Sequence, residues 1–379
     1  MKHFAQDTIL EARGVGRTFT RGGGLFQQRT FVRAVDGVDL TVRRGETLAI
    51  VGESGCGKST LARTLVRLLE PTKGQVLYEG NDIAHLPARD MRRLRKDLQF
   101  VFQDPFSSLN PRMTVGAIVE EPLTVHTQDN KTIRRQKVAG LLQRVGLRSS
   151  MADRYPHEFS GGQRQRIGIA RALASDPSVI VADEPVSALD VSVQAQVINL
   201  LEDLKSEFNL TLILIAHDLA VIRHMSDRVA VMYLGEVVEI GDTETVYGAP
   251  RHPYTQALMR AIPVPAPGMR AMHADLPGDI PSPLNPPSGC RFHTRCGLAD
   301  EQCGIDRPRL QTADGTRQVA CHHWQKIAED RTRQKQEPPR SVATAKRFSL
   351  YREWSRKKKS NGPSSSPAVT TTQRKDKNA

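Results

Sequence analysis

The sequence has no apolar run long enough to cross a membrane. A spanning helix needs about 20 consecutive apolar residues, and the most obvious run in this chain of 379 residues extends only from Leu210 to Ala216. The start of the chain has Asp7 where a signal peptide would need its apolar stretch. We therefore expect a cytoplasmic protein that does not itself enter the bilayer.

The sequence also has little net charge outside its last segment. The formal net charge is +13, and +11 of this falls in residues 331–379. That segment contains the basic run Arg356–Lys359 and the Ser-, Thr- and Pro-rich stretch Ser364–Thr372, a composition that buries too little apolar surface to fold. We expect a disordered basic tail, or alternatively a segment that is attracted to anionic lipid headgroups. No groove-binding motif supports a nucleic-acid partner.

Four short apolar runs predict buried parallel strands, and a polar residue follows each run within two positions. The runs are residues 48–51, 98–101, 179–182 and 212–216. In parallel α/β sheets ligands bind at the carboxyl ends of the strands. We therefore predict an α/β fold in which distant segments meet at one site. Residues from about 105 to 177 have helical apolar spacing and predict a helical subdomain inserted in the sheet.

The segment GESGCGKS at residues 52–59 matches the eight-residue phosphate-loop pattern, also called Walker A. It follows a predicted strand and precedes a helix predicted from Thr60 to Leu69, which argues against a simple Gly-rich turn. Lys58 is expected to reach the terminal phosphates of a nucleotide, and Ser59 to ligate Mg²⁺. The nucleotide-binding residues predicted here are Gly52, Glu53, Ser54, Gly55, Cys56, Gly57, Lys58, Ser59 and Thr60.

Two adjacent carboxylates, Asp183 and Glu184, end the third predicted strand. Burial of two charges there would be costly without a partner. We expect Asp183 to bind Mg²⁺ and Glu184 to polarise the attacking water in phosphoryl transfer. A solvated strand end is the alternative.

The segment Phe159–Gln163 looks like the signature sequence of ABC ATPases. An amphipathic helix follows it, so its amino terminus is left free to bind an anion. In this family that terminus faces the nucleotide held by the opposite cassette, and one subunit therefore carries two incomplete half-sites. The signature residues assigned to nucleotide binding are Ser160, Gly161, Gly162 and Gln163.

Four further positions resemble family elements in the expected order. Gln103 resembles the Q-loop glutamine that senses magnesium and the transmembrane partner, and Asp190 lies in a segment similar to the D-loop. His217 resembles the switch histidine at the γ-phosphate. Phe19 resembles the aromatic residue that stacks on adenine, with Phe31 as the alternative. The resemblance covers residues 8–250 and implies an ATP- and Mg²⁺-binding cassette over residues 1–250.

Residues 251–330 resemble the C-terminal region of dipeptide and oligopeptide importer ATPases, on the segments Arg251–Leu258, Leu276–Gly278 and Cys290–His293. The resemblance implies an ATPase that drives peptide uptake from the cytoplasmic face of the inner membrane. Its expected partners are two permease subunits, a paralogous ATP-binding subunit and, indirectly, a solute-binding protein. Importers of nickel, glutathione or another small solute use the same subunit type. A soluble ATPase switch in translation or DNA repair is the alternative from a different class.

Four of the five cysteines lie in this extension, with the spacing C-x5-C-x6-C-x17-C. Structural disulfides are not expected in a reducing compartment. Clustered thiols there indicate a metal or simply buried small residues, and the spacing does not match paired CxxC units of a zinc ribbon. The resemblance favours a 4Fe–4S iron–sulfur cluster over zinc and over unmetallated thiols. The proposed ligands are Cys290, Cys296, Cys303 and Cys321.

Overall fold

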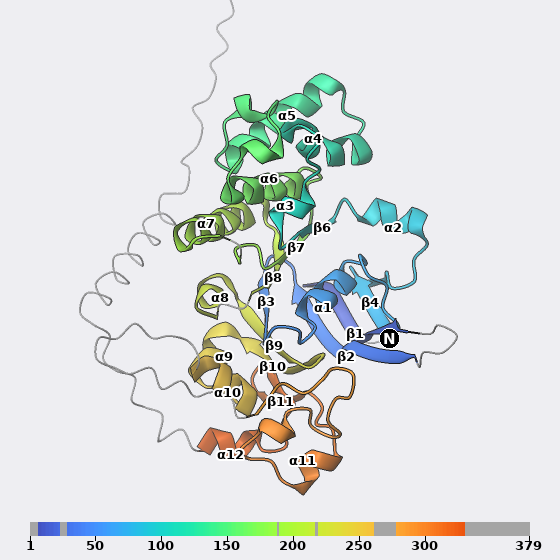
Figure 1. Ribbon diagram of the computed structural model, residues 1–379, viewed down its shortest axis with the longest axis vertical. Helices are drawn as coiled ribbons and strands as arrows, with labels where there is room; N and C mark the ends of the chain where they lie inside the picture. Colours follow the sequence, from blue (N-terminus) through green and yellow to red (C-terminus); the bar gives the residue numbers. More distant parts are fainter. Residues whose placement is uncertain (1–6, 23–28, 188, 217–218, 261–277, 330–379) are drawn as a thin grey trace, which may run out of the picture. The chain divides into compact units, whose positions relative to one another are not determined.

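An eight-stranded sheet contains all four strands that the sequence predicts (Figure 1). The computed structural model describes residues 7–22, 29–187, 189–216, 219–260 and 278–329, which all belong to one structural unit. The predicted strands are adjacent and parallel in the order β3, β8, β7, β6, and their bounds differ from the prediction by at most one residue. From one edge to the other the strands are β11 (Gln311–Asp314), β12 (Arg317–Val319), β10 (Glu236–Asp242), β9 (Arg228–Tyr233), β3 (Thr47–Val51), β8 (Thr211–Ile215), β7 (Val179–Asp183) and β6 (Leu98–Val101).

A second, antiparallel sheet has four strands, and the sequence did not reveal it. Its order is β2 (Thr30–Arg43), β1 (Thr8–Arg21), β4 (Lys73–Tyr78) and β5 (Asn81–Asp82). Helix α1 (Lys58–Leu65) contributes Leu61 and Leu65 to one apolar core that also contains buried residues of both sheets. The amino terminus of α1 is thereby held in place by both sheets.

Helix α1 is shorter than predicted, because the expected helix from Thr60 to Leu69 ends at Leu65. Arg67 has a φ angle of 57°, in the left-handed region that ends helices. Its buried guanidinium donates hydrogen bonds to the carbonyl oxygens of Ile83 and Leu86. These tertiary contacts stabilise the turn and prevent the helix from continuing.

Helices follow β6 and precede β7, where the sequence predicts the inserted subdomain. Their apolar faces pack into one core with the sheet, and Figure 1 shows α4, α5 and α6 grouped beyond β6 and β7. Thr114, Asn130 and Ser160 each accept a backbone hydrogen bond at a helix start, which explains where α4, α5 and α6 begin. The helices are α3 (Pro105–Ser108), α4 (Val115–His126), α5 (Lys131–Arg144) and α6 (Gly161–Leu173).

Seven further helices complete the described regular structure together with short 3₁₀ turns. No helix among the described residues is long and apolar enough to cross a membrane. The helices are α2 (Ala88–Leu94), α7 (Val191–Phe208), α8 (Leu219–Met225), α9 (Thr243–Gly248), α10 (Pro253–Arg260), α11 (Glu301–Ile305) and α12 (Trp324–Glu329), of which α11 and α12 belong to the region after residue 278.

The described part of the extension continues the sheet of the cassette. Strand β12 pairs antiparallel with β10, and Figure 1 shows the extension beside β9 and β10. Glu239 of β10 is fully buried and accepts hydrogen bonds from the backbone N–H groups of Arg251 and His252, at 2.9 Å each. This carboxylate holds the start of α10 against the sheet. The predicted tail, residues 331–379, lies outside the described residues.

Candidate functional site

The phosphate loop connects the end of β3 to the start of α1. Gly52 and Gly57 have φ angles of 152° and 106°. A Cβ atom would lie 2.1 Å from the carbonyl oxygen of Met232 at the first position and 2.0 Å from that of Ala34 at the second. Only glycine fits at these two positions, so the loop can lie directly against neighbouring backbone.

The ammonium group of Lys58 lies inside this loop. The residue is 5% exposed, and its Nζ donates hydrogen bonds to the carbonyl oxygens of Gly52 and Glu53 at 2.8 and 3.0 Å. An ammonium group offers only donors. Its charge is therefore presented to any phosphate that the loop encloses.

Ser59 and Asp183 meet although 124 residues separate them. The Ser59 hydroxyl donates to Oδ1 of Asp183 at 2.7 Å, and Nη2 of Arg63 lies 3.3 Å from Oδ2. Burial raises the pKa of Asp183, the bonds from Ser59 and Arg63 oppose this shift, and the charge of Glu184 adds to it. A hydroxyl beside a carboxylate is a set of hard oxygen donors, the chemistry that Mg²⁺ prefers. These residues therefore fit the predicted magnesium.

Glu184 follows directly, in a backbone conformation that is rare for a residue with a side chain. Its φ angle is 44°, and its backbone N–H donates to the carbonyl oxygen of Ile215 at 3.0 Å. Such conformations are concentrated at functional sites. Nε2 of Gln103 donates to Oε2 of Glu184 at 2.7 Å. The structure thus brings together two side chains that the sequence could only place at the ends of separate strands.

The signature segment forms the start of α6. Ser160 accepts a hydrogen bond from the backbone of Gln163, and the Gln163 side chain accepts one from the backbone of Ser160. This reciprocal capping box fixes the helix start. A Cβ atom on Gly162 would lie 2.3 Å from Cγ1 of Val193, so a glycine there allows α6 to pack closely on α7.

Asp190 caps the start of α7. Its Oδ1 accepts hydrogen bonds from the Ser192 hydroxyl at 2.7 Å and from the Val193 backbone at 3.0 Å. These bonds hold the pKa of Asp190 below its usual value. The residue therefore orders the turn that precedes α7.

Both candidate adenine-stacking residues lie on the paired strands β1 and β2. Phe31 is opposite Thr20, next to Phe19 along β1. The guanidinium of Arg17 lies 4.8 Å from the centre of the Phe19 ring, whereas Phe31 is 55% exposed. The predicted switch residue His217 lies outside the described residues.

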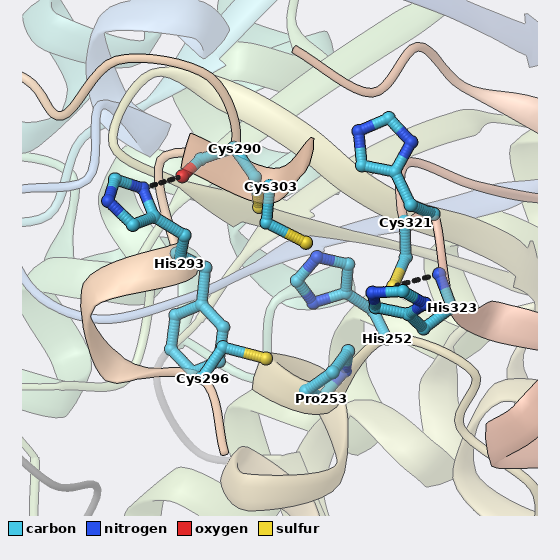
Figure 2. A pocket seen from close by; sticks show the side chains of 10 residues that line it. His252, Pro253, Cys290, His293, Cys296, Cys303, Cys321 and His323 are labelled. Atoms are coloured by element: carbon cyan, nitrogen blue, oxygen red, sulfur yellow. Dashed lines mark hydrogen bonds between the residues drawn. The ribbon is translucent and has the colours of Figure 1, made fainter. Parts of the chain in front are cut away.

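The extension brings its four cysteines to one pocket. In Figure 2 the sulfur atoms of Cys296, Cys303 and Cys321 point toward the same space. Phe292 and the ring of His252 also line it. All four cysteines are free thiols. The lining cysteines are Cys290, Cys296, Cys303 and Cys321.

Burial makes these thiols poor acids. It raises the pKa of Cys290 to about 11 and that of Cys321 to about 12, and neighbouring cysteines add to both shifts. The pKa values of Cys296 and Cys303 are also raised by burial. A soft metal that prefers thiolates would have to displace these protons. Four thiols around one pocket otherwise match the donor set of an iron–sulfur cluster.

A second donor set overlaps this pocket. Asp300, Cys303 and His323 offer ligand atoms within 4.8 Å of one another, and Nε2 of His323 lies 3.0 Å from Oδ2 of Asp300. Carboxylate, thiolate and imidazole together are common zinc ligands. These three residues form a second set of candidate metal ligands beside the four cysteines, for which the sequence left zinc as an alternative.

Two residues near the phosphate loop were missed by sequence reasoning. Oη of Tyr254 accepts a hydrogen bond from the backbone N–H of Glu53 at 2.8 Å. The guanidinium of Arg295 binds the carboxylate of Glu53 at 3.0 and 3.2 Å. Tyr254 lies in the segment Arg251–Leu258, which resembles importer ATPases but does not indicate a contact with the phosphate loop. Nothing in the sequence draws attention to Arg295 except that it precedes Cys296.

Two family models match the chain. The model described as ABC transporter matches residues 35–187. The model described as the C-terminal region of oligopeptide/dipeptide transporters matches residues 238–303. The first range contains the phosphate loop, the signature segment and both carboxylates, and the second contains three of the four clustered cysteines.

Relatives with names of peptide transport proteins match most of the chain. The oligopeptide transport ATP-binding protein AppF of Bacillus subtilis is 54% identical over 84% of this chain and 98% of its own length. The dipeptide transport ATP-binding protein DppF of Haemophilus influenzae is 49% identical over 83% of this chain and 96% of its own. A solved structure of the dimeric ATP-binding cassette MJ0796 with ADP and phosphate is 31% identical. It covers 62% of this chain and 99% of its own, with a TM-score of 0.56.

Proposed function

The chain belongs to the family of ATP-binding subunits of oligopeptide and dipeptide ABC transporters, and from this premise we propose how its residues divide the work of ATP hydrolysis. It is an ATPase subunit that supports ATP-driven peptide uptake. The observation that carries the proposal is the meeting of Ser59, Asp183, Glu184 and Gln103 at the carboxyl ends of the parallel strands.

The phosphate loop and α1 bind the nucleotide, with Lys58 neutralising the terminal phosphates. Ser59, Asp183 and Gln103 would hold Mg²⁺, which would supply positive charge to offset the negative charge of the phosphates. The Ser59–Asp183 contact of 2.7 Å supports this role, since both oxygen donors already lie together. Arg63 balances the buried charge of Asp183.

Glu184 acts as the general base for the attacking water, and His217 supports the γ-phosphate. Gln103 orients the Glu184 carboxylate through their hydrogen bond of 2.7 Å. A fixed orientation matters because proton transfer requires the base to be within hydrogen-bond reach of the water. Phe19 is assigned to stacking on adenine, with Phe31 as the alternative.

The subunit acts with partners. Permease subunits and a solute-binding protein are implied by membership of the family. We assign two permeases and a paralogous ATP-binding subunit to the complex, with this chain peripheral at the cytoplasmic face of the inner membrane. The hydrogen bonds of Ser160 and Gln163 close within their own turn. That arrangement supports the proposal that the start of α6 is available to bind a nucleotide held by another subunit.

The isolated chain should hydrolyse ATP slowly and gain at least about tenfold on assembly with the permeases and the paralogous subunit, because each nucleotide then receives a signature helix from across the interface. ATPase activity is measured against protein concentration and then in reconstituted vesicles with the solute-binding protein and peptide. Full activity of a proven monomer, independent of concentration and partners, would contradict the two-half-site arrangement. Stimulation by nickel or glutathione but not by peptide would favour an alternative solute.

We further assign a 4Fe–4S cluster to the thiol pocket, with zinc at Asp300, Cys303 and His323 as the competing assignment. The presence of four cysteines in the lining of one pocket supports the cluster. The short distances among the other three donors support zinc. A bound cluster would tie together a Pro- and Gly-rich segment and stabilise it.

Protein purified without oxygen is expected to be brown and to hold about four iron and about four sulfide per chain. Serine at any one of the four pocket cysteines should lower the iron content. Cys56→Ser is the matched control, because Cys56 is also buried but lies in the phosphate loop. Zinc in place of iron, lost on Asp300→Asn or His323→Ala, would establish the competing site. A folded extension without any metal would reject both assignments.

A further inference from the structure

The extension contacts the phosphate loop at two points on a single residue, Glu53. Tyr254, 201 residues further along the chain, accepts the hydrogen bond of the Glu53 backbone N–H at 2.8 Å. Arg295, 242 residues further along, binds both carboxylate oxygens of Glu53, with Nη1 at 3.0 Å and Nη2 at 3.2 Å. One contact fixes the backbone of the loop and the other fixes the side chain.

Both contacting residues are held rigidly. Tyr254 has no exposed surface, and its ring packs against Tyr233 and Phe292 at centroid distances of 4.7 and 5.4 Å. Arg295 is 6% exposed, and its Nη1 is 3.4 Å from Oη of Tyr233. An aromatic cluster of Tyr233, Tyr254 and Phe292 therefore fixes the positions of both residues that contact Glu53.

The short segment that carries Arg295 is anchored separately. Arg291 is buried and contacts the carboxylates of Asp36 and Glu236 and the carbonyl oxygen of Leu234. Arg307 adds contacts to the same two carboxylates. The position of Arg295 is thus determined by the body of the cassette and does not depend on Glu53 alone.

The negative charge of Glu53 links its contact with Arg295 to nucleotide binding. Glu53 belongs to the loop that encloses the phosphates, and a free carboxylate there would repel them. Its side chain is 18% exposed, so solvent screens the charge only in part. The two-point contact of Arg295 cancels the charge and fixes the direction of the carboxylate, which a guanidinium does better than an ammonium.

We propose that Arg295 and Tyr254 are positioning residues for ATP binding, which hold the phosphate loop in its binding shape and neutralise Glu53. The inference rests on the proposed nucleotide site and extends it, because it makes the peptide-importer extension part of that site's support. Neither residue touches the reacting atoms, so the effect falls on affinity and not on the chemical step.

Arg295→Ala is expected to raise the Kd of the full-length chain for MgATP about tenfold, within the usual range of coupling between sites. In the assembled transporter KM for ATP should rise while kcat changes by less than about twofold. Arg295→Ala combined with Glu53→Gln should recover most of the lost affinity, because the uncompensated charge is gone. Arg295→Lys should recover less, since it restores charge without the two-point contact. Tyr254→Phe should also raise Kd, by about threefold to tenfold, through loss of one hydrogen bond.

Arg144→Ala is the matched control. Arg144 also pairs with a carboxylate, that of Glu207 at 2.9 Å, but this pair is exposed and involves neither Glu53 nor the segment that carries Arg295, so the Kd for MgATP should stay within about twofold. Equal loss of ATP affinity in the Arg144 and Arg295 variants, or no recovery in the double variant, would overturn the proposal. Failure of the unmodified chain to bind MgATP would instead overturn the nucleotide site itself.

Discussion

Glu184→Gln should reduce ATP turnover of the assembled transporter by about 10²- to 10⁴-fold, the usual contribution of a general base. Glutamine has the same shape and can still accept the hydrogen bond that Glu184 receives from Gln103 at 2.7 Å. The negative charge that polarises water is lost. ATP affinity should change little, because the phosphate loop, Ser59 and Asp183 are untouched.

The response of Asp183 to the substitution is a further reason to expect that turnover falls while ATP affinity is kept. Burial raises the pKa of Asp183 and the charge of Glu184 raises it further. Removing that charge lets Asp183 ionise more readily, so the oxygen ligands of magnesium are retained. Single-turnover hydrolysis and MgATP binding are measured on the same preparation.

Glu120→Gln is the matched control for Glu184→Gln. Glu120 pairs with Arg134 at 2.8 Å in the helical subdomain, and its substitution should leave turnover nearly unchanged. Substantial hydrolysis by the Glu184 variant would remove this residue from the role of base. Loss of ATP binding would show that Glu184 supports the loop instead.

Lys58→Ala should weaken MgATP binding by about 2 kcal/mol, or roughly thirtyfold, the scale of a hydrogen bond to a charged group. The variant loses the ammonium that is enclosed in the loop, and with it the bonds to the carbonyl oxygens of Gly52 and Glu53. The loop then lacks both its positive charge and part of its internal support. Isothermal titration with MgATP measures the effect directly.

Lys137→Ala provides the comparison for this loss of charge. Lys137 forms an exposed ion pair with Asp129 at 2.6 Å, and such pairs contribute little. Its substitution should leave ATP affinity unchanged. Unaltered affinity in the Lys58 variant would contradict the nucleotide-loop assignment.

The local parts of the site were readable from the sequence. The phosphate loop is an eight-residue pattern whose conformation depends on its own glycines, with φ angles of 152° at Gly52 and 106° at Gly57. The parallel strands were found because both of their faces are buried, and all five residues of β3 and of β8 have buried side chains. Capping residues such as Ser160 act within one helical turn, which makes them visible in sequence.

Strands that lie half in solvent were not found. Strand β2 alternates exposed and buried residues over much of its length, and β1 pairs with it through several shifts of register. Charged residues interrupt both strands. Such strands become recognisable only through their partners, because pairing and burial on one face stabilise them.

By itself the sequence determined the family of the chain and predicted the residues of the nucleotide site, since both depend on residue types at short, fixed spacings. Tertiary structure alone decided which distant side chains meet. Ser59 reaches Asp183 across 124 residues, and Glu53 reaches Arg295 across 242. Charge complementarity between such residues leaves no periodic pattern along the chain, because the contact is created by the packing of the strands and helices that carry them. The extension therefore reads as a separate segment in sequence but supports the phosphate loop in space.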